Sequence, residues 1–226
     1  MRRKLGYLLL FIGIVLFTLP FIGRFILSIK DSSKYVDEIN ADQIRENSRR
    51  VATFNFEDVR PIDLSTELFD LSKIDKDLII GQIISPAINL NLAIFKGTND
   101  TNLKAGACTL REDQEMGKNN YPIAGHNLGD KDKLFNRVEH IPNGTDVFIT
   151  DKDKIYQYKI VNREILPEDA FYKISAEEAD KYKKPIITLM TCEYPLTYAR
   201  VFAVGELQNT YDFSDAKLKE LIKNAK

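Results

Sequence analysis

Eight short runs rich in β-branched and aromatic residues occupy the sequence between residues 78 and 208. Each run is bounded by Pro, Gly, Asn or Asp, and this combination predicts strands separated by turns. The runs are Leu78–Ser85, Ala87–Phe95, Ala105–Leu110, Tyr121–His126, Thr145–Thr150, Ile155–Val161, Pro185–Cys192 and Arg200–Gln208. Eight strands in succession predict a mainly β domain, which is either a barrel or a sandwich.

The seventh run ends in a cysteine, and the eighth run begins with an arginine. A loop of about seven residues separates Cys192 from Arg200, which is at the long end of the range for a hairpin. Such a hairpin places the two residues side by side at one end of the sheet. A guanidinium lowers the pKa of a neighbouring thiol and can also stabilise an oxyanion. We interpret Cys192 as a candidate nucleophile, although a buried strand cysteine is also a common structural residue.

The chain has two histidines, so few residues are available to act as a base for this thiol. His126 ends the fourth run in the sequence Ala-Gly-His-Asn, whereas His140 lies in a predicted helix and matches no motif. A histidine that only caps a strand would have the same local sequence as His126. We predict that His126 is the functional imidazole and that His140 is a surface residue.

Together these residues resemble the catalytic motifs of the sortase family. Residues 188–192 read Thr-Leu-Met-Thr-Cys, which is similar to the Thr-Leu-x-Thr-Cys motif of sortases. Residues 124–126 and Arg200 occupy the places where that family has its histidine and its arginine. The Thr-Leu-x-Thr-Cys and histidine motifs in this order are a strong indication together, whereas either motif alone is a weak one.

The resemblance extends from about residue 78 to residue 207. Gly81–Gly97 is similar to the first pair of strands in the family, and Asp132–Phe135 is similar to a helical Leu-Phe element that follows the histidine. The resemblance implies a closed eight-stranded β-barrel with short helices. Within the family the chain is most similar to class A, and a class D or class E enzyme is the alternative.

The family's chemistry implies a role for each of these residues. Cys192 is the nucleophile, His126 is the general acid and base, and Arg200 stabilises the oxyanion and the substrate. Thr191 precedes the nucleophile, a position that helps to shape the substrate groove in the family, and Ala124 is a small residue that leaves room beside the histidine. Both are candidate substrate-binding residues. The implied reaction is covalent catalysis in two steps, and it requires no cofactor.

The resemblance also implies the partners. The substrate is a secreted protein with a C-terminal Leu-Pro-x-Thr-Gly signal, which is cut between Thr and Gly. The acceptor is an amine of a peptidoglycan precursor, as in Gram-positive bacteria. A cysteine peptidase that releases its product to water is an alternative of the same reaction type. A non-enzymatic adhesion or scaffold domain is the alternative from another class.

Some class A sortases bind calcium through acidic residues between their third and fourth strands. The corresponding positions here are Arg111, Gln114 and Lys118. Calcium prefers several oxygen ligands, usually including carboxylates. Two cations and one amide do not supply them, so we predict that this loop binds no metal.

The N-terminus carries Arg2, Arg3 and Lys4, followed by an uncharged and predominantly apolar run over Leu5–Gly23. A run of about twenty apolar residues is long enough to cross a bilayer. Clustered positive charge in front of such a run indicates a cytoplasmic N-terminus. We therefore predict an uncleaved single-pass anchor in the cell membrane, with the catalytic domain outside. A cleaved signal peptide is the alternative, but the run is long for one and no Ala-x-Ala site follows it.

The predicted organisation has five parts. They are a cytoplasmic N-terminus (1–4), a membrane anchor (5–29), an extracytoplasmic stalk or linker (30–77), a catalytic β-barrel (78–208) and a C-terminal surface helix (209–226). The linker is polar and has no sustained apolar face; alternatively, part of it folds over the active site. Short helices are predicted at Thr101–Leu103, Leu134–His140 and Ala176–Tyr182, and a C-terminal helix capped by Ser214.

Composition sets two further limits. The formal net charge is −1, which argues against nucleic acid as a partner. The two cysteines have neither CxxC spacing nor a neighbouring histidine cluster, so no thioredoxin-like or zinc motif is present. Cys108 lies in a small-residue strand, and we interpret it as a buried core residue rather than the disulfide partner of Cys192.

Overall fold

The computed structural model describes residues 4, 6–7, 10–15, 17–18, 32–54, 74–127, 129, 134–193 and 198–225. The strands are β1 (Ile79–Ser85), β2 (Leu90–Phe95), β3 (Ala107–Thr109), β4 (Asn120–Ala124), β5 (Asp146–Thr150), β6 (Lys154–Pro167), β7 (Ile186–Cys192) and β8 (Ala199–Asp212). The α-helices are α2 (Ser33–Asp37), α3 (Ala41–Asn47), α5 (Asp100–Leu103) and α6 (Asp215–Asn224). Short 3₁₀ helices are η1 (Lys76–Leu78), η2 (Pro86–Ile88), η3 (Asn136–His140), η4 (Phe171–Ile174) and η5 (Ala176–Lys181).

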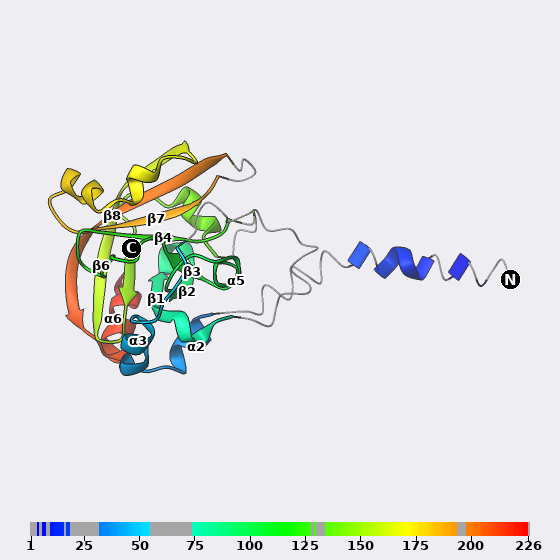
Figure 1. Cartoon of the computed structure of the whole chain (residues 1–226), viewed down its shortest axis with the longest axis horizontal. Coiled ribbons are helices and arrows are strands. Elements are labelled where there is room, and N and C mark those ends of the chain that lie inside the picture. The colour runs from blue at the N-terminus through cyan, green and yellow to red at the C-terminus, as the bar shows by residue number, and fades with distance from the viewer. Residues whose placement is uncertain are drawn as a thin grey trace.

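The strands form a closed barrel in the order β1-β2-β3-β4-β7-β8-β6-β5. Figure 1 shows how the strands and the surrounding helices are arranged. Each of the eight predicted runs contributes one strand, so the predicted eight-stranded barrel is confirmed. Pairing between β1 and β5 closes the ring. Most neighbours are antiparallel, but β2 pairs with β3, and β4 with β7, in parallel. These parallel pairs join strands that no hairpin can connect.

Alternation along the strands divides the apolar side chains between two clusters. In β7, Leu189 belongs to the cluster that fills the barrel, whereas Met190 belongs to a second cluster shared with α2 and α5. In β8, Ala203 belongs to the cluster that fills the barrel and Phe202 belongs to the second cluster. Successive side chains of a strand point to opposite faces, so Cys192 shares the face of Met190. The thiol therefore lies at the end of the second cluster and not inside the barrel.

The strands β6 and β8 are 14 residues long each, which is longer than the predicted runs. They pair along their whole length, with two register shifts that mark bulges. The added part of β6 is charged and half-exposed over Asn162–Glu164, so its sequence does not show the apolar alternation of a strand. Pairing with β8 nevertheless continues through Leu166 opposite Arg200.

Two helices within the predicted linker pack against β1 and β2 (Figure 1). Val36 of α2 is fully buried in the second cluster, and Asn47 of α3 donates a hydrogen bond to the carbonyl of Ile79 at 2.9 Å. The ammonium of Lys152 donates to two carbonyls near the end of α2, each at 2.6 Å. A lysine at this position also favours the helix dipole. Residues 32–54 are thus part of the folded domain.

The described residues include no helix that is long and apolar enough to span a membrane. Much of the predicted anchor at 5–29 lies outside the described residues, so the anchor stays a prediction.

The predicted helices of the domain are present as α5, η3 and η5. The C-terminal helix α6 begins after Ser214, whose hydroxyl accepts a hydrogen bond from the backbone N–H of Lys217, as expected for a cap.

Candidate active site

Three strand ends bring the predicted catalytic residues together. Cys192 at the end of β7 is the register partner of Arg200 in β8, which confirms the predicted hairpin register. On the other side of β7, Ala124 of β4 is the partner of Met190 in a parallel pair. His126 lies two residues beyond Ala124, in the loop that follows β4.

Side-chain hydrogen bonds fasten the histidine loop to the end of β7. The hydroxyl of Thr191 donates to the carbonyl of Gly125 at 2.8 Å, and the amide of Asn127 donates to the carbonyl of Cys192 at 3.0 Å. The same amide also contacts the carboxylate of Glu139 on η3. His126 thus lies between two residues that are both held to the strand of the nucleophile.

Gly125 is required where the chain turns into the histidine loop. A Cβ atom at this position would lie 2.5 Å from the ring of Phe135, closer than any real contact. Phe135 is fully buried, and its backbone N–H donates to the carbonyl of His126 at 3.0 Å. The ring therefore packs directly on the backbone beside His126 and supports its position.

The imidazole of His126 is buried, with 7% of the residue exposed. Among the described residues its Nε2 atom has no hydrogen-bond partner. Burial, helped by the positive charge of Lys104, lowers the pKa of His126 from 6.5 to about 4. The imidazole is therefore neutral at pH 7 and can accept a proton.

The thiol of Cys192 is partly exposed, and its environment acts on its pKa in both directions. Burial raises the pKa, Arg200 lowers it, and the carboxylate of Glu168 raises it again, with a net increase. The thiol therefore holds its proton at neutral pH. Both side chains are thus uncharged at neutral pH.

The guanidinium of Arg200 lies largely inside the protein, with 13% of its side chain exposed. Its Nη2 atom is 3.3 Å from Oε2 of Glu168, and its Nη1 donates to the carbonyl of Ala199 at 3.3 Å. These contacts keep the cation at the end of β8, beside its register partner Cys192.

The two predicted binding residues are buried in this structure. Thr191 is 2% exposed and its hydroxyl is donated to the protein backbone, while Ala124 packs in the second apolar cluster. Contact of either residue with a substrate stays a prediction. His140, in contrast, has an 81% exposed side chain and lies on η3, as expected for a surface residue.

Sequence reasoning missed two polar residues of this site. Asn127 directly follows His126 in the sequence, and this adjacency could have indicated that Asn127 belongs to the site. Glu168 gave no signal, because its approach to Arg200 depends on the extended pairing of β6 with β8.

The loop that corresponds to a calcium site in some relatives is tied together by its own side chains. Arg111 donates to both carboxylate oxygens of Asp113, at 2.9 and 2.8 Å, and Lys118 pairs with Glu115. The amide oxygen of Gln114 accepts hydrogen bonds from two backbone N–H groups of the loop. The predicted absence of a metal stays a prediction.

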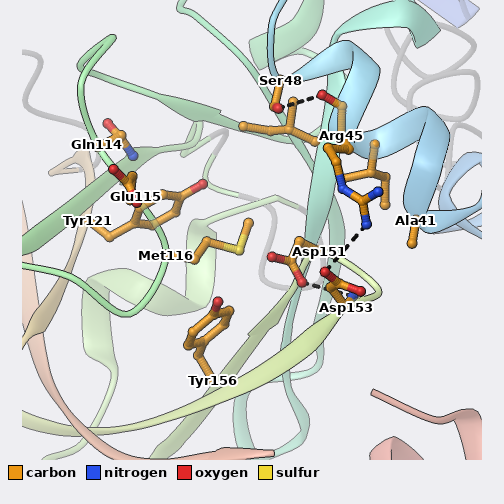
Figure 2. A pocket seen from close by; sticks show the side chains of 12 residues that line it. Ala41, Arg45, Ser48, Gln114, Glu115, Met116, Tyr121, Asp151, Asp153 and Tyr156 are labelled. Atoms are coloured by element: carbon orange, nitrogen blue, oxygen red, sulfur yellow. Dashed lines mark hydrogen bonds and ion pairs between the residues drawn. The ribbon is translucent and has the colours of Figure 1, made fainter. Parts of the chain in front are cut away.

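A cavity of about 250 Å³ lies away from these residues (Figure 2). It is bounded by α3, by the segment between β3 and β4, and by the turn between β5 and β6. Figure 2 shows Arg45 of α3 directed toward Asp153, and the two form an ion pair at 3.5 Å. None of the predicted catalytic residues lines this cavity.

The sequence and the fold match known proteins. The Sortase domain family matches residues 83–208. Sortase A of Listeria monocytogenes is 35% identical over 211 residues, which cover 93% of each chain. Sortase A of Streptococcus agalactiae is 32% identical over 226 residues, covering 95% of this chain and 87% of that protein. A solved structure of Listeria monocytogenes sortase A, 35% identical, matches with a TM-score of 0.58 and covers 64% of this chain and 97% of its own.

These matches extend over most of the chain, and the range matched by the family, 83–208, spans His126, Cys192 and Arg200. The relatives named Sortase A favour class A over class D or class E. Family membership also decides against a non-enzymatic scaffold. The chain belongs to the sortase family of cysteine transpeptidases.

Proposed function

We propose that this chain is a membrane-anchored transpeptidase that cuts a C-terminal Leu-Pro-x-Thr-Gly signal between Thr and Gly. It transfers the acyl group to an amine of a peptidoglycan precursor and so attaches secreted proteins to the cell wall. The observation that carries the proposal is the register pairing of Cys192 with Arg200, together with the hydrogen bonds that join both neighbours of His126 to the end of β7. The relatives named Sortase A support it.

In the first step, His126 accepts the thiol proton, and the Cys192 sulfur attacks the carbonyl carbon of the substrate threonine. The carbonyl oxygen becomes an oxyanion, which the guanidinium of Arg200 stabilises. When this intermediate collapses, the bond between carbon and the glycine nitrogen breaks. The imidazolium of His126 gives its proton to the departing amine, and a thioester remains on Cys192.

In the second step, the acceptor amine attacks the thioester carbonyl, again with the oxyanion beside Arg200. His126 removes a proton from the attacking nitrogen, and the new amide forms as the carbon–sulfur bond breaks. The thiolate of Cys192 leaves and takes the proton back from His126. The enzyme returns to its neutral pair with no net change in protons.

The lowered pKa of His126 suits this sequence. A buried imidazolium is a strong acid, so it protonates the leaving amine readily. The same burial makes the ion pair of thiolate and imidazolium a minor species before substrate binds. Exclusion of water by the bound peptide strengthens the contact with Arg200, because electrostatic interactions grow in a medium of low dielectric constant.

The location proposed for the enzyme is the cell membrane, with residues 1–4 in the cytoplasm and one crossing by residues 5–29. The support is the positive charge of Arg2, Arg3 and Lys4 in front of the apolar run. The folded domain then faces the cell wall, where both proposed substrates are found.

The reaction is tested by incubating the full-length chain in detergent with a Leu-Pro-x-Thr-Gly peptide, with and without an added amine. We expect an amide between the threonine carboxyl and the amine to be the main product when the amine is present. A product that is the free threonine acid at every amine concentration would support the cysteine peptidase alternative and contradict the transferase.

A further inference from the structure

Glu168 follows β6 directly, and its carboxylate contacts the arginine that lies beside Cys192. The distance from Arg200 Nη2 to Glu168 Oε2 is 3.3 Å. The backbone is fixed as well, because the N–H of Glu168 donates to the carbonyl of Tyr198 at 3.1 Å. Main chain and side chain together tie the end of β6 to the start of β8.

The register explains why this contact reaches the nucleophile. Leu166 of β6 is the partner of Arg200, and Arg200 is the partner of Cys192. Directly paired residues present their side chains on the same face of a sheet. The guanidinium therefore lies between the thiol on one side and the end of β6 on the other.

We propose that Glu168 is a positioning residue for the reaction: its carboxylate holds the Arg200 guanidinium at the end of β8 and partly neutralises it. The thiol of Cys192 then keeps its proton until the peptide carbonyl engages Arg200. This inference rests on the proposed function.

The electrostatics at the thiol agree with this geometry. Arg200 lowers the pKa of Cys192 and Glu168 raises it, after burial, which is the largest cause. Among the described residues, Arg200 from β8 and Glu168 after β6 are the charged groups that act on the pKa of the thiol. His126 in the loop after β4 and the adjacent Glu193 are further titratable groups at this end of the barrel. With 58% of its side chain exposed, Glu168 is screened by solvent, so its effect is modest.

The test is the pH dependence of iodoacetamide alkylation at Cys192, measured on the full-length chain by mass spectrometry. Glu168→Gln removes the charge and keeps a hydrogen-bonding group of the same size. We expect its alkylation profile to move to lower pH and the rate near pH 7 to rise roughly two- to fivefold, as for one screened charge. Asp169→Asn is the matched control, because this neighbouring carboxylate is also exposed. An unchanged profile for Glu168→Gln, or an equal change for Asp169→Asn, would overturn the proposal.

A second comparison separates positioning through Arg200 from direct action on the thiol. In an Arg200→Gln background we expect Glu168→Gln to have a clearly smaller effect on the alkylation rate, because the group that Glu168 holds is gone and only the direct effect of its charge on the thiol remains. An undiminished effect in that background would overturn the positioning role. Alkylation requires no peptide, so a wild-type chain that neither cleaves nor transfers the peptide would refute the proposed function, while the alkylation profiles would still decide the role of Glu168.

Discussion

The buried neutral imidazole makes a quantitative prediction about stability at low pH. The pKa of His126 is about 4 in the folded protein against 6.5 as its ordinary value. The unfolded chain therefore binds a proton between pH 6.5 and pH 4 that the folded chain does not. Stability falls as the pH falls through this range and is fully retained above it. This direction is expected for a histidine whose protonated form is destabilised by burial in the folded protein.

The size of this loss of stability follows from the two pKa values of His126, since a difference of one pKa unit corresponds to about 1.36 kcal/mol. For His126 the loss in the free energy of unfolding is about 2 kcal/mol at pH 5 and about 3 kcal/mol at pH 4, relative to pH 7. No discount for solvent screening applies, because the residue is only 7% exposed.

The assay is urea denaturation of a form that begins at residue 30, followed by circular dichroism at several pH values. Other groups titrate in this range as well, so the pH dependence of the free energy of unfolding is compared between wild type and His126→Asn. The asparagine side chain cannot be protonated in this range. We expect the wild type to lose about 2 kcal/mol more than His126→Asn between pH 7 and pH 5. His140→Asn, at an exposed position, should follow the wild type. Parallel curves for wild type and His126→Asn would refute the burial argument.

Three further predictions concern the oxyanion, the metal and the N-terminal helices. Arg200→Lys keeps the positive charge but loses the planar guanidinium and its paired N–H donors, so peptide cleavage should slow by about 10²–10³-fold. In the same assay, His140→Ala should cleave at nearly the wild-type rate. Activity should be unaffected by a chelator; a several-fold loss that calcium restores would show that the enzyme binds calcium. A form that begins at residue 74 loses the buried side chains of Val36 and Ile44 and should be less stable by about 3–6 kcal/mol in urea denaturation than one that begins at residue 30.

The local features of the site were predictable because they depend on short stretches of sequence. The run that ends at Cys192 and the run that begins at Arg200 are neighbours along the chain, so a hairpin fixes their register. The His126 contact is different, because β4 and β7 are parallel and lie far apart in sequence. Only the family motif, and not strand periodicity, indicated that His126 belongs beside Cys192.

Other parts were missed for physical reasons. A helix over Tyr35–Val51 is compatible with the sequence, but the packing of α2 and α3 against the barrel was not predicted, because Lys152 and Asn47, which hold them there, resemble ordinary surface residues in the sequence. Glu168 was missed because β6, the strand before it, continues through charged residues that are held in the sheet by pairing with β8 and show no apolar alternation of their own. In each case a long-range contact overrides the local pattern.

The central claim is that Cys192 carries the acyl group, and the mass of the intact protein tests it most directly. The full-length chain is incubated with a Leu-Pro-x-Thr-Gly peptide in the absence of added amine and analysed within one turnover. We predict an added mass equal to the peptide up to its threonine, located on Cys192, removed by an added amine and missing in Cys192→Ala. The buried Cys108 should stay unmodified. An adduct on another residue, or turnover of the peptide by Cys192→Ala, would contradict the account.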